Sequence, residues 1–103
     1  LPWVRALLMH DDRAVVLAAL ATLGQLRDED AVAALRDLLV SPDDEKVEHV
    51  LYALGSIRST DALVLLRSTA QLHPVPRLRA IAADTLERAM RAQAASRSQA
   101  PSP

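Results

Sequence analysis

The chain has 103 residues, half of them apolar, and no cysteine, so it is long enough for one domain and has neither disulfides nor thiolate metal sites. It has one Trp, one Tyr and no Phe, so any core must be built from Leu, Val and Ala, and with only two glycines the composition favours an all-α fold. The net charge of −1 divides unevenly: residues 1–66 hold six Arg or Lys and eleven Asp or Glu (−5), whereas residues 67–103 hold six Arg and two acids (+4), which favours a charged partner.

No segment is recognisable as a membrane span or an export signal. The longest apolar run, Ala14 to Leu23, is far shorter than the ~20 residues that a membrane-spanning helix needs. The start, Leu1-Pro2-Trp3, has neither the charged beginning nor the small-residue cleavage site of a signal peptide. We therefore expect a cytoplasmic protein.

Apolar residues that recur at helical spacing predict a series of amphipathic helices. The chain begins part-way through a first helix, residues 1–10, so we expect a fragment of a longer array. Helices follow at about 12–26, 31–40, 44–57, 62–72 and 76–91. Residues 92–103 are rich in Ser, Gln, Ala and Pro and are predicted to form a flexible tail, which leaves residues 1–91 as the folded domain.

Capping residues indicate where these helices begin. Ser41-Pro42-Asp43-Asp44 is the clearest start, and Ser41 is expected to be the N-cap. Asp28 or Asp30 is expected to cap the helix before it. The turn His73-Pro74-Val75-Pro76 prevents the preceding helix from continuing, because neither proline has an N–H to donate.

The helices repeat in pairs at a spacing of 31 residues. The matches at this shift are Leu23-Gly24 with Leu54-Gly55, Asp30-Ala31 with Asp61-Ala62, and Leu35-Arg36 with Leu66-Arg67. Self-similarity at such a period is typical of stacked helical hairpins, each of which buries its apolar faces against its neighbours.

Gly24 and Gly55 are the only glycines, and they occupy the same position in successive repeats. A glycine inside a helix costs about 1 kcal/mol relative to alanine, so it indicates either an early helix end or the close approach of a neighbouring helix. We favour close approach, because Leu26 and Ile57 continue the inward apolar stripe beyond each glycine. The third copy has Glu87 at this position, so we expect the last hairpin to be the terminal cap of the array.

The pattern D-x-x-V-x-x-A-x-x-A-L-G, followed by a polar turn and D-A-x-x-x-L, resembles HEAT repeats, especially the short bacterial kind known as phycobilisome-lyase HEAT-like repeats. The resemblance covers about residues 1–90 and implies a short right-handed α-solenoid of antiparallel helical hairpins. It also implies a non-enzymatic scaffold for protein–protein interaction. One departure is that only Arg79 keeps the basic residue that often follows the second-helix valine in this family, since Val16 and Val47 replace it.

By this resemblance the second helix of each hairpin lines a concave surface, and seven of its outward residues are candidates for partner binding. These are Leu17, Glu45, Glu48, His49, Tyr52, Asp84 and Arg88. Tyr52 is central, and tyrosine is enriched in interface hot spots, so the expected partner is a basic or amphipathic segment of another protein. Neighbouring repeats of the parent protein are further expected partners. The alternative is a solvated helix face, with Leu17 covered by the first helix.

The sequence has no pattern that indicates catalysis. No histidine shares a repeat position with another and most of the serines lie in caps and the tail, so we expect no catalytic site. Within His10-Asp11-Asp12 and Glu48-His49, adjacent side chains point about 100° apart on a helix, so we expect no metal site. No phosphate-binding glycine loop is present, and we expect no cofactor.

Two other functions stay open as alternatives. A bilin-lyase-related or other enzyme-accessory role follows from the family resemblance and would need a broad apolar groove. Nucleic-acid binding at the arginine-rich end is disfavoured, because that end has no aromatic residue for base stacking and the rest of the chain is acidic.

Overall fold

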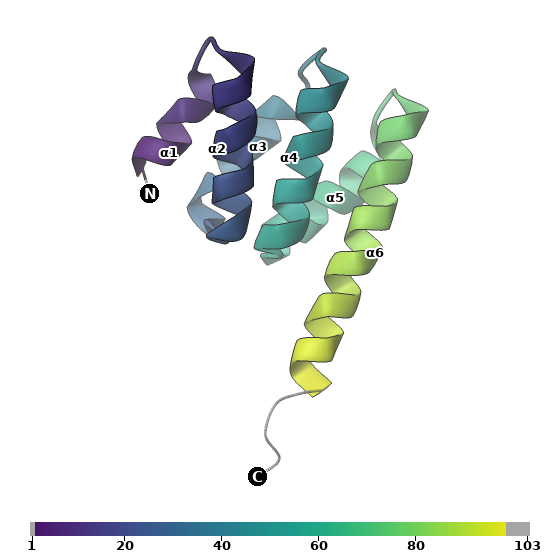
Figure 1. Ribbon diagram of the computed structural model, residues 1–103. Helices are drawn as coiled ribbons and strands as arrows, with labels where there is room; N and C mark the ends of the chain where they lie inside the picture. The colour runs from purple at the N-terminus through teal and green to yellow at the C-terminus, as the bar shows by residue number, and fades with distance from the viewer. Residues whose placement is uncertain (1, 99–103) are drawn as a thin grey trace.

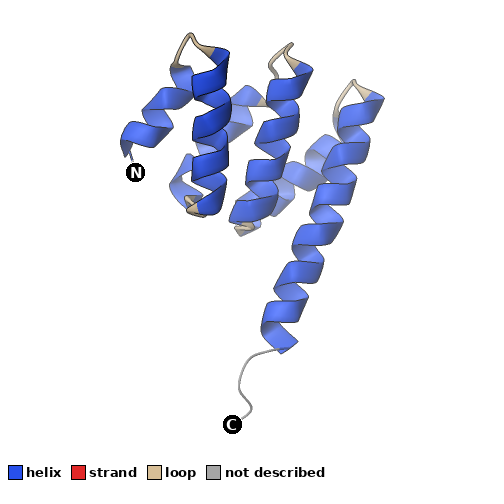
Figure 2. Cartoon of the chain, viewed as in Figure 1, coloured by secondary structure: helices blue, strands red, loops and turns tan. Residues whose placement is uncertain are grey.

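The computed structural model describes residues 2–98, and all of the regular structure in that range is helical (Figure 2). The elements are α1 (Pro2–Ala6), η1 (Leu7–Met9), α2 (Arg13–Gln25), η2 (Glu29–Ala31), α3 (Val32–Leu38), α4 (Asp44–Ile57), α5 (Thr60–Leu72) and α6 (Pro76–Ser98). The segments η1 and η2 are single 3-10 turns. The expected all-α fold is confirmed for the part of the chain that the structure describes.

The longer helices form two layers. In Figure 1, α2, α4 and α6 run side by side in the front layer, and α3 and α5 lie behind them. In the front layer α4 contacts both α2 and α6, and α5 packs against α4 and α6. The turns that lead into α2, α4 and α6 lie together at the upper end of Figure 1, so the carboxyl ends of α2 and α4 lie at the lower end.

The core consists mainly of leucine, valine and alanine, as the composition predicts. Its largest fully buried side chains are Leu20, Leu23, Leu35, Leu51, Leu54, Leu66, Leu78, Val4, Val16, Val47 and Val50. The only two aromatic residues of the Phe, Trp and Tyr group, Trp3 and Tyr52, lie at the surface. Packing between these helices therefore rests on aliphatic side chains, which lets the helices approach closely.

The start of α4 differs from the prediction, because Asp43 is its N-cap and Ser41 is not. The Ser41 Oγ accepts the Asp43 N–H at 3.2 Å and so forms a turn before the helix. The Asp43 carboxylate accepts the Lys46 N–H at 3.2 Å, and its negative charge suits a helix N-terminus. Neither Asp28 nor Asp30 caps α3, whose N-cap is Ala31 without a side-chain bond. Asp28 instead caps the preceding 3-10 turn η2, where its carboxylate accepts the Asp30 N–H at 3.2 Å.

The end of α2 also differs from the prediction. The helix ends at Gln25, so Leu26 lies beyond it and is 53% exposed instead of facing inward. Positive φ follows both Leu26 and Ile57, at Arg27 and Arg58, but the last turn differs: the Arg27 N–H bonds to the Gly24 carbonyl three residues back, whereas the Arg58 N–H bonds to the Leu54 carbonyl four residues back. Ile57, at the equivalent position, lies within α4 and is buried as expected.

The last helix continues past the predicted end at Arg91 as far as Ser98. Alanine is frequent in this extension and has the highest helix propensity. The Gln93 Nε2 also donates to the backbone carbonyl of Arg58 at 2.9 Å, which holds α6 against the end of α4. The tail predicted for residues 92–103 is thus helical as far as Ser98, and residues 99–103 lie outside the described part. No helix within residues 2–98 is both long and apolar enough to cross a lipid bilayer.

The close approach predicted at the two glycines is confirmed. A Cβ atom on Gly24 would lie 3.3 Å from the Cα of Ala53 and 3.4 Å from the Cβ of Ser56, both in α4. A Cβ atom on Gly55 would overlap the Cγ2 methyl of Thr85 in α6. Each glycine therefore lets one front-layer helix touch the next.

A Gly55→Ala variant tests this contact. We expect a net loss of about 1 kcal/mol in the free energy of unfolding, because overpacking costs about 1–3 kcal/mol and alanine returns about 1 kcal/mol of helix propensity. Thr85→Ser removes the methyl group that the new Cβ meets, so Gly55→Ala should cost less in that background. Chemical denaturation of the four proteins gives the coupling energy.

Gly24→Ala is the matched control for this cycle, because its new Cβ would meet Ala53 and Ser56 and not Thr85. Thr85→Ser should leave the effect of Gly24→Ala unchanged. If Thr85→Ser relieved both glycine variants equally, or neither, the contact between Gly55 and Thr85 would not be the cause.

Candidate functional site

The candidate site is the outward face of the front layer, where α4 contributes its central residues. Tyr52 lies on this face and is 45% exposed, outside the buried stripe of α4 as predicted. Its hydroxyl donates to the Glu48 Oε2 at 2.7 Å, one turn earlier on the same helix. The Glu48 Oε1 accepts from the Arg77 Nη2 at 2.5 Å. This chain of bonds links the α4 tyrosine to the first turn of α6.

These bonds shift the pKa values of the two α4 groups in opposite directions. The hydrogen bond from Tyr52, and then the one from Arg77, hold the pKa of Glu48 below its ordinary value despite partial burial. The same bond to Glu48 raises the pKa of Tyr52, because ionisation would place two negative oxygens together. The stabilisation from Glu48 is therefore present above its ordinary pKa and is lost as the pH falls through its folded-state pKa.

The remaining predicted residues of α4 and α6 are also held by local contacts. The His49 ring meets the Tyr52 ring edge-on, with 6.2 Å between the ring centroids, and its Nδ1 lies 2.8 Å from the Glu45 carbonyl oxygen. Asp84 and Arg88 form an ion pair one turn apart on α6. The acidic residues Glu48 and Asp84 are thus already engaged by arginines.

Leu17 does not form an exposed apolar patch of its own. It is partly buried and packs against the core cluster. Its neighbours Ala14, Ala18 and Ala21 on α2 are exposed. The structure therefore gives this part of the face only small apolar side chains.

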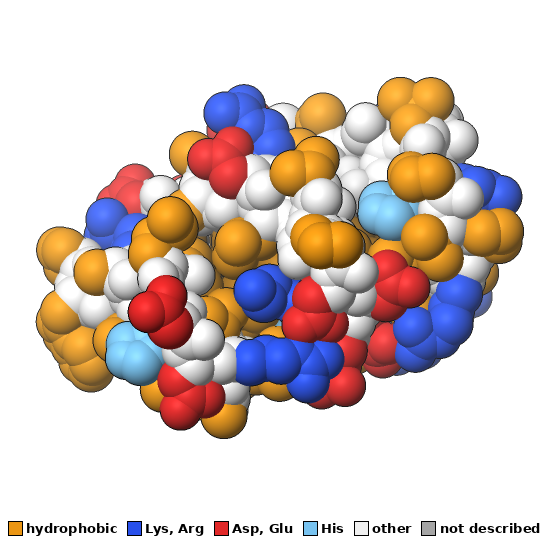
Figure 3. All heavy atoms as spheres, turned by 90° about the horizontal axis from the view of Figure 1, so that it is seen from above, with side chains coloured by type: hydrophobic (Ala, Val, Ile, Leu, Met, Phe, Trp, Pro, Cys, Tyr) orange, Lys and Arg blue, Asp and Glu red, His pale blue; other side chains and the backbone are white. Residues whose placement is uncertain are grey.

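Ion pairs connect the front helices through the amino-terminal half of α4. Arg13 of α2 donates to the Asp43 carboxylate at 2.5 and 2.9 Å and lies 3.3 Å from the Glu45 carboxylate. The hydrogen bond from Arg13 lowers the pKa of Asp43 well below its ordinary value. The family often has a basic residue just after the second-helix valine, at the positions that Val16 and Val47 occupy here. The ion pairs of this chain use other positions, those of Arg13, Asp43 and Glu45. Seen from above, the turn end of the molecule shows acidic and basic side chains next to one another (Figure 3).

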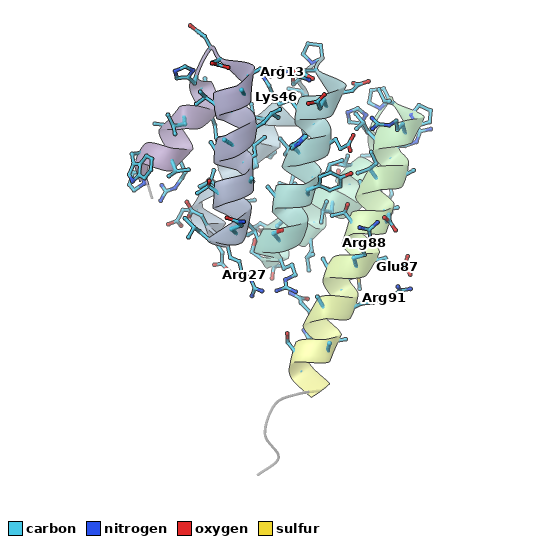
Figure 4. All side chains as sticks on the ribbon, viewed as in Figure 1. Arg13, Arg27, Lys46, Glu87, Arg88 and Arg91 are labelled. Atoms are coloured by element: carbon cyan, nitrogen blue, oxygen red, sulfur yellow. The ribbon has the colours of Figure 1, made fainter. Side chains whose placement is uncertain are left out.

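A groove lies at the opposite end of the same face. Its larger hollow, of about 540 Å³, is lined by residues of α2, α4, α6 and the turns after α2 and α4: Gly24, Gln25, Arg27, Tyr52, Gly55, Ser56, Arg58, Thr85, Arg88, Ala89 and Ala92. A second hollow, of about 300 Å³, shares Arg27 and Arg58 and adds Ile57, Gln93, Ser96 and Arg97. We call the two together the basic groove. Figure 4 shows Arg27 at the lower end of α2 and Arg88 on α6.

Only two of the seven predicted residues, Tyr52 and Arg88, line the basic groove. The sequence reasoning missed Arg27, Arg58 and Arg97. A signal for the first two was present, because Gly24-Gln25-Leu26-Arg27 and Gly55-Ser56-Ile57-Arg58 repeat the pattern Gly-x-x-Arg at the spacing of the repeat.

The histidines outside the face have roles in turns. The His10 Nδ1 accepts the Asp12 N–H at 2.9 Å, and the His73 Nδ1 accepts the Val75 N–H at 3.0 Å. Both therefore act as local caps before α2 and α6. Within residues 2–98, no three side chains of His, Asp or Glu come together in a way that would hold a metal ion.

Titration of Tyr52 tests the hydrogen bond at the centre of the face. Tyr52 is the only tyrosine, so its ionisation is read directly from the ultraviolet absorbance. We expect a pKa above the ordinary value in the wild-type protein and a lower pKa in Glu48→Gln, which keeps an acceptor but loses the charge. Glu45→Gln is the control, since Glu45 pairs with Arg13 and should leave the Tyr52 pKa unchanged. Equal values in the wild type and Glu48→Gln would show that the bond is not formed.

Comparison with known proteins agrees with the helical hairpins described above. A family model for HEAT repeats matches residues 1–52, just over half of the chain, from α1 into α4. No curated protein and no solved structure gives a significant match. The matched segment contains the first hairpin, including Gly24, and most of the second, as far as Tyr52 of α4. The chain therefore belongs to the HEAT repeat family.

Proposed function

We propose that this protein is a short right-handed α-solenoid that acts as a non-enzymatic protein–protein interaction module, and that it binds a segment of another protein across α2, α4 and α6. HEAT repeats generally mediate protein–protein interactions, which supports the general role. The observation that carries the specific proposal is the basic groove, because residues from three successive second helices line it together.

The size and lining of the groove suit an extended segment of a protein. Its larger hollow falls within the 300–1,000 Å³ (roughly) that is usual for binding pockets. Tyr52 offers a ring with a hydroxyl at its edge, and such residues bury area while keeping one hydrogen bond. Small residues, Ala89 and Ala92 among them, line the α6 side and leave room for a peptide backbone.

The seven predicted contact residues divide into three groups in this proposal. Tyr52 and Arg88 contact the partner in the groove. Glu48 and Asp84 hold those two side chains in place from the same helices. The proposed roles of Glu45, His49 and Leu17 are contacts at the rim, closer to the turn end of the face. The family resemblance to bilin lyases adds an enzyme-accessory role as the alternative proposal, and an absorbance change on mixing with a bilin would support it.

A Tyr52→Ala variant tests the proposed interface. Since the ring lies outside the core, the melting temperature should stay nearly unchanged. If Tyr52 is a hot spot, affinity for the partner should fall by about 2 kcal/mol or more. To identify the partner, a photo-crosslinking amino acid replaces Tyr52, and captured proteins are identified by mass spectrometry.

The control is the same photo-crosslinking amino acid in place of Val64. Val64 is 59% exposed on α5, in the layer behind, so it samples a surface of the same protein outside the proposed interface. Adducts formed from both positions alike, or a Tyr52→Ala variant that melts earlier yet binds as tightly, would contradict the proposal.

A further inference from the structure

The charges that line the basic groove are all of one sign. Four arginines, Arg27, Arg58, Arg88 and Arg97, line its two hollows, and no aspartate or glutamate of the described chain lines either of them. A neighbouring hollow outside the groove also touches Arg27 and is lined by Asp28, Glu29 and Asp30. This contrasts with the turn end of the same face, where carboxylates and guanidinium groups are paired. The groove therefore concentrates positive charge in a protein whose net charge is −1.

Three of these arginines have no ion-pair partner among the described residues: Arg27, Arg58 and Arg97. Of the three acidic residues that follow Arg27, Asp28 and Asp30 pair with Arg5, whereas Glu29 has no ion pair in the described chain. The Asp28 carboxylate accepts from the Arg5 Nε at 2.8 Å, and the Asp30 carboxylate lies 3.8 Å from the Arg5 guanidinium. Burial alone would raise the pKa of Asp28, but the bond from Arg5 lowers it.

The backbone at Arg27 and Arg58 gives a second reason to assign them a role. Both have positive φ, 50° and 57°, and they are the only residues other than glycine in the described chain that do. Helix ends of this kind usually take glycine or asparagine, because a larger side chain strains the left-handed conformation. The helix dipole favours a positive charge near each helix carboxyl end. A lysine or arginine one residue before the left-handed position would give the same interaction with the dipole without backbone strain.

We propose that the basic groove binds an acidic peptide segment of the partner protein, with Arg27 and Arg58 donating to its carboxylates. This proposal rests on the proposed interaction function and specifies the chemistry of the partner. Arginine matches a carboxylate with two parallel N–H donors, so two arginines one repeat apart suit acidic side chains spaced along an extended peptide. Arg88 stays paired with Asp84 and contributes less free charge. The partner thereby differs from the basic or amphipathic segment that the sequence predicts.

A peptide fits these observations better than a nucleic acid does. The groove has one aromatic side chain, Tyr52, and its hydroxyl is already bonded to Glu48. Nucleic-acid binding without base readout relies on several stacking aromatic residues and a long basic track. At the other end of the face, Arg13 and Arg77 are paired with Asp43, Glu45 and Glu48. The unpaired positive charge therefore does not continue along the face as a track for an extended polyanion.

The test measures binding of a fluorescein-labelled peptide of alternating glutamate and alanine by fluorescence anisotropy. The same peptide with lysine in place of glutamate, and a labelled single-stranded oligonucleotide, are the comparison probes. The wild-type protein should bind the acidic peptide most tightly, and Arg27→Gln/Arg58→Gln should weaken this binding about tenfold or more, as expected when charge-assisted hydrogen bonds are lost.

The matched control is Arg36→Gln/Arg67→Gln. These arginines also lie one repeat apart, on α3 and α5, and both are exposed without an ion-pair partner in the described chain. The control changes the net charge by the same amount, but neither arginine lines the basic groove, so the affinity for the acidic peptide should stay nearly unchanged. Circular dichroism should show both double variants folded.

Several results would overturn the proposal: no binding of the acidic peptide, equal binding of the lysine peptide, equal losses in the two double variants, or tighter binding of the oligonucleotide. Light scattering gives a further such result: if the wild type dimerises and Arg27→Gln/Arg58→Gln does not, a second copy of the chain occupies the groove.

If a protein captured at position 52 binds Arg27→Gln/Arg58→Gln as well as it binds the wild type, the interaction function stands and the acidic ligand is wrong. If the acidic peptide binds as expected but no protein is captured at position 52, the acidic-ligand site stands and the proposed interaction function is wrong.

Discussion

Close contact between successive front-layer helices is the constraint on which the candidate site depends. α2 meets α4 at Gly24 and α4 meets α6 at Gly55, because neither glycine has a Cβ to hold the next helix away. The same two glycines line the basic groove beside Thr85 of α6. A larger side chain at either position would separate the helices and also fill part of the groove. Helix packing and the shape of the site therefore depend on the same residues.

The two ends of the front layer differ in how their charges are used. At the turn end, carboxylates of α4 are bonded to Arg13 from one side and Arg77 from the other, so the charges hold neighbouring helices together. At the carboxyl end, Arg27 and Arg58 have no acidic partner in the described chain, so their charge is available to a ligand. Helix dipoles favour this arrangement of acids at amino ends and arginines at carboxyl ends.

Part of the candidate site could be predicted because it lies within one helix. The spacing of Glu48 and Tyr52 places them one turn apart on the same side, which the helical period alone determines. The pair between Arg77 and Glu48 joins residues 29 apart, so it depends on where α6 packs against α4. The groove depends on the same packing, since Tyr52 and Arg27 come from different repeats. Leu17, whose partial burial depends on its neighbours, could not be placed from its repeat position alone.

The sequence by itself determined the helical hairpins, the repeat of 31 residues, the aliphatic core and the close approach at the glycines, because periodicity, capping residues and the lack of a Cβ act locally or between adjacent repeats. The sequence also placed both ends of α4 and the end of α5, but only the structure decided where α2 and α6 end and which charges are free. Leu26 is exposed at the tightened last turn of α2, and α6 extends to Ser98, with Gln93 bonded to the Arg58 carbonyl at the end of α4. The bond from Gln93 joins residues 35 apart in the chain, and the spacing of apolar residues does not encode such a contact.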